Sequence, residues 1–241
     1  WNSLFPRIEN SLVNISRWAA AGRRHTARGL VVTDWGDFGH YNLQGNSWLA
    51  FAWAAQESWS GASEPRRFDR AFSRQLFGDA HGETARLYRE LGAIHDPGFA
   101  MFNGSPLQYL FFDDLETAYF LCACKAAALA RAIAKLERVQ RRIAAKRADP
   151  AKAGRDDLTL DELLYAADAS LFTLRKAQAA LEWDAWRRAP ASLGASQRRE
   201  LSGRLADLAA QQQALGRRLR RLWLARSEPS NLSDTERRLL R

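Results

Sequence analysis

Three long runs of apolar residues, spaced alternately three and four positions apart, constrain the fold of this chain more than any other feature. They cover residues 115–143, 160–181 and 201–222. This spacing places the apolar side chains in a narrow stripe along one helix face, and helices with such stripes pack side by side at about 20°. The linkers 149–156 and 189–195 contain proline and glycine and are short enough to join antiparallel neighbours. The sequence therefore predicts an antiparallel three-helix bundle.

The first third of the chain has a different pattern. Between Pro6 and Ala21 apolar residues recur at helical spacing, and the helix is expected to end at residues 22–24. The run 30–32, Leu-Val-Val, reads as a short buried strand after Gly29. A helix followed by a strand is the repeating unit of an α/β barrel. A second helix is expected from Ser47, with Trp48 and Trp53 as packing residues. The helices expected next cover about 68–77 and 85–94, followed by an aromatic-rich loop over 96–106.

The residues after the predicted strand suggest a binding site. Residues 33–40 read Thr-Asp-Trp-Gly-Asp-Phe-Gly-His. An aromatic ring can stack on the apolar face of a pyranose, and a carboxylate accepts hydrogen bonds from its hydroxyl groups. The alternative is a surface turn that carries Asp and Trp without a ligand. Binding residues concentrate on loops held by a rigid scaffold, which is where this motif is expected.

The motif also resembles a known family. Thr33-Asp34-Trp35-Gly36-Asp37, followed by Gly39-His40, resembles the last barrel strand of the family 20 glycoside hydrolases, the β-N-acetylhexosaminidases, in their bacterial branch with a helical C-terminal domain. Residues 1–7 are similar to the segment after the preceding barrel strand, and residues 47–59 are similar to the last barrel helix. Residues 222–230, including Arg226, are similar to the branch more weakly. The specific part of the resemblance lies within about the first 60 residues.

The resemblance implies a fold and a domain organisation. The expected fold class is mainly α, with the last β/α unit of a TIM (β/α)8 barrel followed by a helical domain that contains the three-helix bundle. Residues 1–62 would be the C-terminal remnant of the catalytic barrel, 63–112 short helices and a loop packed on it, and 113–241 the helical bundle. The chain would start after the seventh barrel strand, so its first residue says nothing about a compartment.

The resemblance also implies an activity and the residues that serve it. Such enzymes hydrolyse terminal β-linked N-acetylhexosamine with retention, and the acetamido oxygen of the substrate is the nucleophile. The Asp-Glu pair that assists this reaction would lie upstream of Trp1, so no catalytic residue is assigned. Trp35 matches a wall of the sugar subsite, Asp37 a carboxylate that binds hydroxyls, and Trp1 a weaker pocket candidate. Asp34 is expected to point away from the sugar, because side chains alternate along a strand. His40 receives no role.

The charge and the cysteine content limit which partners and cofactors other than a sugar are expected. Residues 1–112 hold 11 Lys or Arg against 10 Asp or Glu, and the remainder holds 25 against 17, a net charge of +8. Basic helices suggest nucleic-acid binding, but no aromatic residues are interleaved with the arginines as a stacking platform requires. No apolar run is long enough to span a membrane. Cys122 and Cys124 are too few and too closely spaced for a disulfide framework or a zinc site, and no cofactor is expected.

Two other functional classes remain open at this point. The chain could be a non-catalytic assembly module whose helical domain makes the contacts, including those of a homo-oligomer, or a basic helical nucleic-acid-binding protein. The glycosidase is favoured because the specific resemblance falls on pocket residues. The apolar stripes of the three long helices are equally compatible with an assembly module and with a nucleic-acid-binding protein. An N-acetylhexosamine-terminated glycan is the expected substrate; the sequence does not distinguish GlcNAc from GalNAc.

Overall fold

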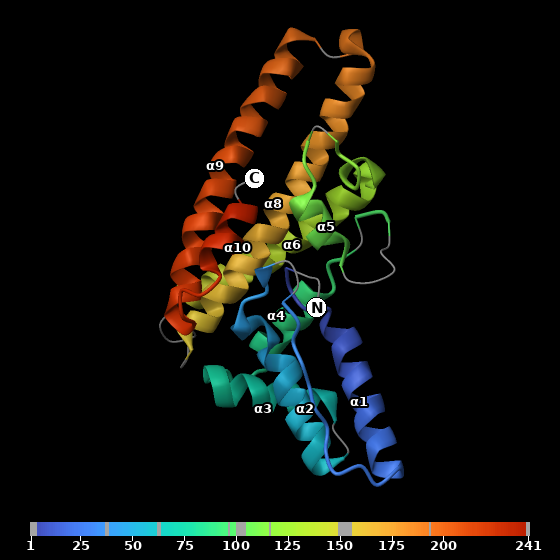
Figure 1. Cartoon of the computed structure of the whole chain (residues 1–241), viewed down its shortest axis with the longest axis vertical. Helices are drawn as coiled ribbons and strands as arrows, with labels where there is room; N and C mark the ends of the chain where they lie inside the picture. The colour runs from blue at the N-terminus through green and yellow to red at the C-terminus, as the bar shows by residue number, and fades with distance from the viewer. Residues whose placement is uncertain are drawn as a thin grey trace.

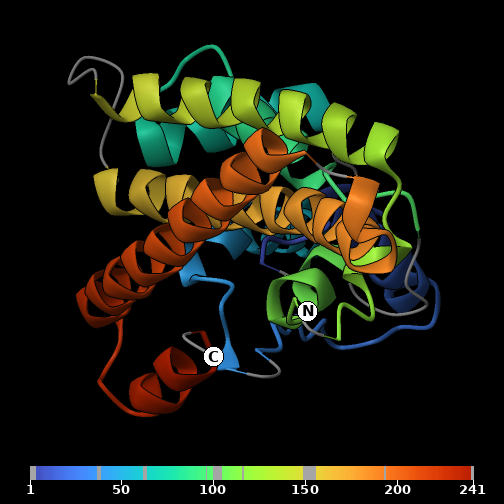
Figure 2. The same cartoon turned by 90° about the horizontal axis from the view of Figure 1, so that it is seen from above.

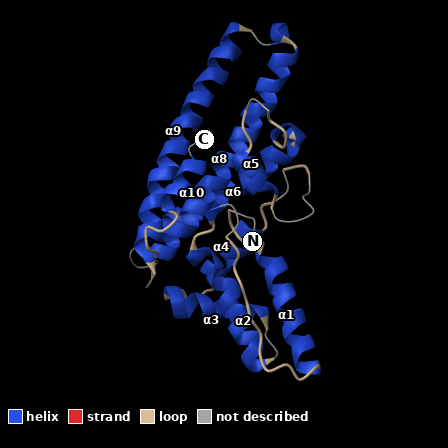
Figure 3. Cartoon of the chain, in the orientation of Figure 1, coloured by secondary structure: helices blue, strands red, loops and turns tan. Residues whose placement is uncertain are grey.

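The computed structural model is mainly helical, and Figure 3 shows only helices and loops. It describes residues 4–36, 39–61, 64–95, 97–99, 105–115, 117–148, 156–192 and 194–239. No strand occurs among them, so the prediction of a mainly α fold is confirmed, but the barrel strand predicted at 30–32 is not present. The order of a helix, an extended segment and a helix is kept, without the β-sheet that a TIM barrel unit requires.

The predicted strand is absent because it has no neighbour to pair with. Residues 29–36 are extended and run past α1 (Ile8–Arg24) and α2 (Trp48–Ser60), as Figure 1 shows. Between described residues, no backbone hydrogen bond joins this segment to the rest of the chain. A strand is defined by a ladder with a partner, and apolar β-branched residues alone do not supply one.

The N-terminal helices pack through apolar and aromatic side chains. α1 lies against α2 and ends at Arg24, within the segment 22–24 that was expected to end it. α3 (Pro65–Phe77) is closed by Gly78 in the left-handed conformation, with a φ of 68° that favours glycine. α4 (Glu83–Gly92) packs on α3 and α1. Trp53 meets Phe68 edge to face at 4.9 Å between ring centroids, so its predicted packing role is confirmed.

The first long helix begins later than its apolar pattern suggests. α5 (Pro106–Phe112) was not expected from the sequence, and α6 (Ala126–Ala148) starts eleven residues after position 115. Asp113 explains the delay, because its Oδ2 accepts hydrogen bonds from the N–H groups of Phe120 and Leu121 and so holds a turn. Cys122 lies in this turn, in η3 (Leu121–Ala123), and both cysteines are free thiols.

α8 (Asp157–Arg188) is the centre of the molecule. It packs against α6, α9 (Ala195–Arg226), α5 and the short helix η2 (Gln44–Ser47), so nearly every side of it is covered. Its buried side chains accordingly lie on several faces of the helix, beyond the single apolar stripe that the sequence indicated. Figure 2 shows α6 beside α8, with α9 crossing α8 obliquely. The three helices predicted by the seams are therefore present.

A last helix, α10 (Leu232–Leu239), comes after α9 and was not expected from the sequence. It folds back against α9 and buries Leu232, Thr235 and Leu239. Its Thr235 contacts residues 39–41, so the C-terminal end of the chain lies beside the loop next to the sugar-binding motif. No helix in the described ranges is long and apolar enough to cross a membrane.

We expect the isolated chain to self-associate, because residues 29–36 combine free backbone groups with an exposed apolar side chain. Val31 is 87% exposed, and an unpaired extended edge with an apolar side chain promotes pairing with another chain. Sedimentation velocity over a range of concentrations should show oligomers that Val31→Lys reduces. Leu224→Lys, which changes an exposed leucine on α9, is the control. Equal association of parent and Val31→Lys would contradict the expectation.

Candidate functional site

A groove of about 540 Å³ lies where α1, the extended segment and the start of α2 meet. Its walls combine apolar side chains with hydroxyl, amide and carboxylate groups, the mixture that a sugar requires. The groove is lined by Pro6, Asn10, Ser11, Asn14, Ile15, Trp18, residues 30–35, Ser47, Ala50 and Phe51.

Trp35 presents its ring at this groove. The side chain is 63% exposed, and its Nε1–H donates a hydrogen bond to Thr33 Oγ1 at 3.0 Å. The bond fixes one edge of the indole to the extended segment and leaves a large aromatic surface open to a ligand. The other two predicted substrate residues, Trp1 and Asp37, lie outside the described residues, so the structure does not place them.

The carboxylate of Asp34 forms hydrogen bonds within the protein. Its Oδ2 accepts hydrogen bonds from Ser47 Oγ at 2.5 Å and from Asn42 Nδ2 at 3.2 Å, and Asn42 also donates to Ser47 Oγ. Asp34 therefore ties the extended segment to the start of α2. Asp34 nevertheless lines the groove together with Ser47, so the expectation that it points away from the sugar stays a prediction. Ser47 precedes α2 as expected, but its side chain makes no helix cap and bonds to Asp34 instead.

His40 packs against the motif. A Cβ at Gly36 would lie 1.7 Å from His40 Nδ1, so the imidazole occupies the space that any other residue at position 36 would need. His40 itself has a φ of 57°, a left-handed conformation that is uncommon for a residue other than glycine. The sequence indicated no role for His40; its ring covers the backbone next to Trp35.

α10 holds the loop that begins at Gly39. Thr235 Oγ1 donates a hydrogen bond to the Gly39 carbonyl at 2.9 Å, and the Tyr41 hydroxyl donates to the Thr235 carbonyl at 2.6 Å. Tyr41 and Thr235 are both buried, and burial raises the pKa of Tyr41 to about 12. The phenol therefore stays protonated and can act as a donor at any ordinary pH.

α8 and α4 hold the same loop further along, at Gly45. The Gly45 N–H donates to Glu162 Oε2 at 2.9 Å, and the Tyr88 hydroxyl donates to the Gly45 carbonyl. A Cβ at position 45 would lie 1.9 Å from Glu162 Oε2, so the approach is one that only glycine allows. Both polar groups of Gly45 are thus satisfied by side chains far away in the sequence.

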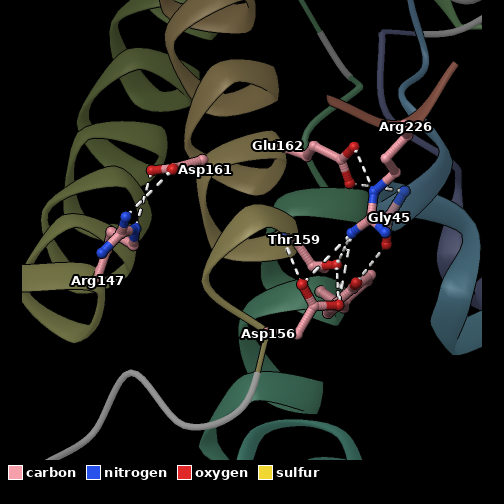
Figure 4. Close-up of polar contacts among 8 residues, drawn as sticks. Gly45, Arg147, Asp156, Thr159, Asp161, Glu162 and Arg226 are labelled. Atoms are coloured by element: carbon pink, nitrogen blue, oxygen red, sulfur yellow. Dashed lines mark hydrogen bonds and ion pairs between the residues drawn. The ribbon is translucent and has the colours of Figure 1, made fainter. Parts of the chain in front are cut away.

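Arg226 completes a polar cluster at the junction of α8, α9 and the loop, shown in Figure 4. Its guanidinium donates to Glu162 Oε1 at 2.8 Å and to Thr159 Oγ1 at 2.6 Å, and Asp156 lies 3.4 Å away. It also lies over the Trp48 ring, 5.9 Å from the centroid. Burial raises the pKa of Glu162, and the hydrogen bond from Arg226 opposes that rise only in part. In the same view, Arg147 pairs with Asp161 separately.

Two further carboxylates of the N-terminal region, Glu64 and Asp79, have structural roles. Glu64 caps α3 by accepting from the N–H groups of Arg66 and Arg67. Burial opposes the ionised form of Asp79, but hydrogen bonds from Thr84 and His81 and the charge of Lys146 outweigh it, so its pKa is lowered. Neither is placed as a general acid. No group of His, Cys, Asp and Glu suited to a metal ion occurs in the part of the chain that the structure describes.

About half of the basic side chains on the long helices form local ion pairs. A groove of about 460 Å³ runs between α6, α8 and α9, but two of its arginines, Arg175 and Arg218, pair with Glu137 and Asp168. The arginines of the described part of 113–239 that form ion pairs include Arg142, Arg147, Arg175, Arg187, Arg188, Arg204, Arg218, Arg220, Arg226 and Arg237. This pairing weakens the case for a phosphate-binding surface.

The sequence missed most residues that shape this site. Glu162 and Thr235 are separated from the motif by more than 100 positions, and no local pattern marks them as partners of the loop. Arg226 lies in the C-terminal segment that resembles the same family branch weakly, but that resemblance assigned it no role at the site. Comparison with known proteins yields no match to any family model, curated protein or solved structure.

Proposed function

We propose that this chain is the C-terminal part of a retaining β-N-acetylhexosaminidase, to which it contributes residues of the sugar pocket. The observation that carries the proposal is the exposed indole of Trp35 at the edge of the groove between α1 and α2. An anchored aromatic ring beside polar groups is the arrangement used to bind a pyranose. The resemblance of residues 33–40 to the last barrel strand of this family supports the same assignment.

The chain's own residues would bind and orient the sugar. Trp35 would stack on the apolar face of the N-acetylhexosamine, and Asp37 would accept hydrogen bonds from hydroxyls remote from the scissile bond. Asp34 has a different task, because its carboxylate already accepts hydrogen bonds from Ser47 and Asn42. It would hold Trp35 in place through the backbone.

The bond-breaking step would depend on residues outside this chain. As the resemblance implies, the acetamido oxygen of the substrate attacks the anomeric carbon while a Glu gives its proton to the leaving oxygen, and an Asp orients the acetamido group. Water then opens the cyclic intermediate and restores the acetamide, with the same configuration at the anomeric carbon. Binding energy from Trp35 would serve this reaction by fixing the ring where the attack occurs.

Because the proposal places the general acid upstream of Trp1, the chain of 241 residues alone should not hydrolyse an aryl N-acetyl-β-glucosaminide. Release of the aryl alcohol by purified protein should equal that in buffer between about pH 4 and 8, the range in which such acids work. Asp37→Ala should make no difference to this background. Turnover above buffer that Asp37→Ala abolishes would show that the catalytic acid lies within the chain.

The reading frame upstream of the codon for Trp1 provides the direct test. Under the proposal it encodes six further strand–helix units with an Asp-Glu pair after the fourth strand. The extended protein should hydrolyse the same aryl substrate and release the β-anomer first. A start codon directly before Trp1, or an upstream sequence without that pair, would contradict the proposal and favour a non-catalytic assembly module.

A further inference from the structure

The C-terminal helix α10 contacts the motif region although nearly 200 residues separate them in sequence. Thr235 is 1% exposed, and its side chain and carbonyl each form one hydrogen bond to the loop, at Gly39 and Tyr41. No other residue of α10 has a hydrogen bond of this kind among the described contacts, since Glu236 and Gln212 link α10 to α9 instead. Thr235 is therefore the point at which α10 meets the loop.

Two further contacts connect the loop held by α10 to the residues on either side of Trp35. His40, between the two anchored residues, packs its ring on Gly36, the residue directly after Trp35. Asn42 comes directly after Tyr41 and donates to Asp34, the residue directly before Trp35. The backbone on both sides of Trp35 is thus in contact with a segment that α10 holds in place.

The conformation of His40 requires such support. Its φ of 57° is a left-handed backbone conformation, and a residue with a side chain adopts it only where the surroundings fix it. The hydrogen bonds of Thr235 to Gly39 and from Tyr41 lie on either side of His40. Without them His40 would relax towards ordinary backbone angles, and its ring would leave Gly36.

We propose that Thr235 of α10 is a positioning residue for the Trp35 wall, acting through Gly39, His40 and Tyr41. The sugar-facing role of Trp35 rests on the proposed function, whereas the coupling between α10 and Trp35 rests on the contacts alone. The C-terminal helices would then be a required part of the sugar pocket and not an appended domain.

The test uses the full chain labelled with 5-fluorotryptophan and compares three variants. Thr235→Val removes the hydroxyl and keeps the shape, Thr235→Ser restores a hydroxyl, and Ser233→Ala is a matched control at an exposed position of the same helix. In Thr235→Val the fluorine signal of Trp35 should shift and broaden, and amide exchange of residues 39–47 should become about tenfold faster, as expected for the loss of a buried hydrogen bond. The signal of buried Trp53 should not move, and Thr235→Ser should behave like the parent.

Two further measurements keep the outcome decisive. If Thr235→Val does not fold, Tyr41→Phe removes only the hydroxyl that bonds to the Thr235 carbonyl, and the same Trp35 and exchange changes are expected. Equal Trp35 signals and equal exchange in Thr235→Val and Ser233→Ala would overturn the positioning role. Titration of the parent extended protein with the thiazoline mimic of the cyclised intermediate tests the proposed function separately. Its failure to bind would remove the sugar assignment and leave the α10 coupling to be decided by the fluorine signal.

Discussion

Trp35→Ala should lower the catalytic efficiency of the extended enzyme by about 150- to 5,000-fold. Loss of an aromatic wall from a packed site costs about 3–5 kcal/mol, and each 1.36 kcal/mol corresponds to a factor of ten in kcat/KM. Trp35 is exposed in this chain and would be covered by the sugar, so its contribution should appear in binding and hardly in stability. The free energy of unfolding should therefore change little.

Two further variants separate the contribution of the aromatic ring of Trp35 from that of its indole nitrogen and from the effect of removing any exposed tryptophan. Trp35→Phe keeps an aromatic face but loses the hydrogen bond to Thr33, so its kcat/KM should fall between those of the parent and Trp35→Ala. Trp59→Ala is the control, because Trp59 is 94% exposed on α2 and does not line the groove. It should leave kcat/KM unchanged.

Substitution of a second candidate, Asp37, should have a smaller effect on kcat/KM than substitution of Trp35, and, unlike substitution of the general acid, it should not alter the pH dependence. Loss of hydrogen bonds to a charged acceptor costs about 1.5–3 kcal/mol, so Asp37→Ala should be less damaging. Neither variant should move the limb of the pH–rate profile assigned to the acid, and both should weaken binding of the thiazoline mimic. Unchanged affinity for that mimic in both variants would place the motif on an ordinary surface turn.

The helices of this fold could be predicted from the sequence where apolar residues repeat every three or four positions. The seam from Leu160 to Leu181 lies within α8, and the seam from Leu201 to Leu222 lies within α9. The start of α6 was not readable, because the side chain of Asp113 competes with the helix for backbone N–H groups. α10 is a helix of eight residues, too short for its own periodicity to be distinctive.

The extended segment at 29–36 shows a second reason why a local sequence pattern does not determine the structure. Leu30, Val31 and Val32 have strong strand propensity, yet whether such residues form a strand depends on what lies beside them. In this chain α1 and α2 flank the segment and no described strand does. Trp35 as a site residue stays a prediction, to which the structure adds an exposed ring at the edge of a groove.

The framework of the site could not be predicted because it consists of long-range pairs. Gly45 meets Glu162 and Gly39 meets Thr235, in each case through one backbone group and one distant side chain. A single sequence contains no period or spacing that joins such positions. The sequence did indicate the local motif, and the structure adds the helices that hold it.

Arg226→Ala should destabilise the fold by about 3–5 kcal/mol, the range found when one partner of a buried ion pair is removed. The Glu162 side chain is only 1% exposed, so its carboxylate would remain buried without its counter-charge, while Thr159 would lose a donor. Urea unfolding at pH 8 would measure the change. Arg220→Ala is the control on the same helix, because its partner Glu236 is bonded at an exposed site, and pairs of that kind contribute only about 0.2–1 kcal/mol.

The pH dependence of the stability loss in Arg226→Ala should show that the buried carboxylate of Glu162 causes it. Burial already raises the pKa of Glu162 above its ordinary value of 4.5, and Arg226 opposes the rise, so Arg226→Ala should raise it further. A carboxyl group whose pKa is higher in the folded state binds more protons there than in the unfolded state. Its contribution to stability is therefore complete below about pH 4.5 and is lost as the pH rises through the folded-state value. The defect of Arg226→Ala should accordingly be larger at pH 8 than at pH 5.

A double variant tests whether charge or packing dominates. Glu162→Gln with Arg226→Met removes both charges, keeps an acceptor for the Gly45 N–H and fills similar volume, so it should recover much of the lost stability. Its stability relative to the parent should also depend less on pH than that of Arg226→Ala. If Arg226→Ala is no less stable than Arg220→Ala at pH 8, and its defect is the same at pH 5, then Glu162 carries no buried charge. In that case the junction between the loop and the long helices would be held by the packing of Leu43, Trp48 and Leu222.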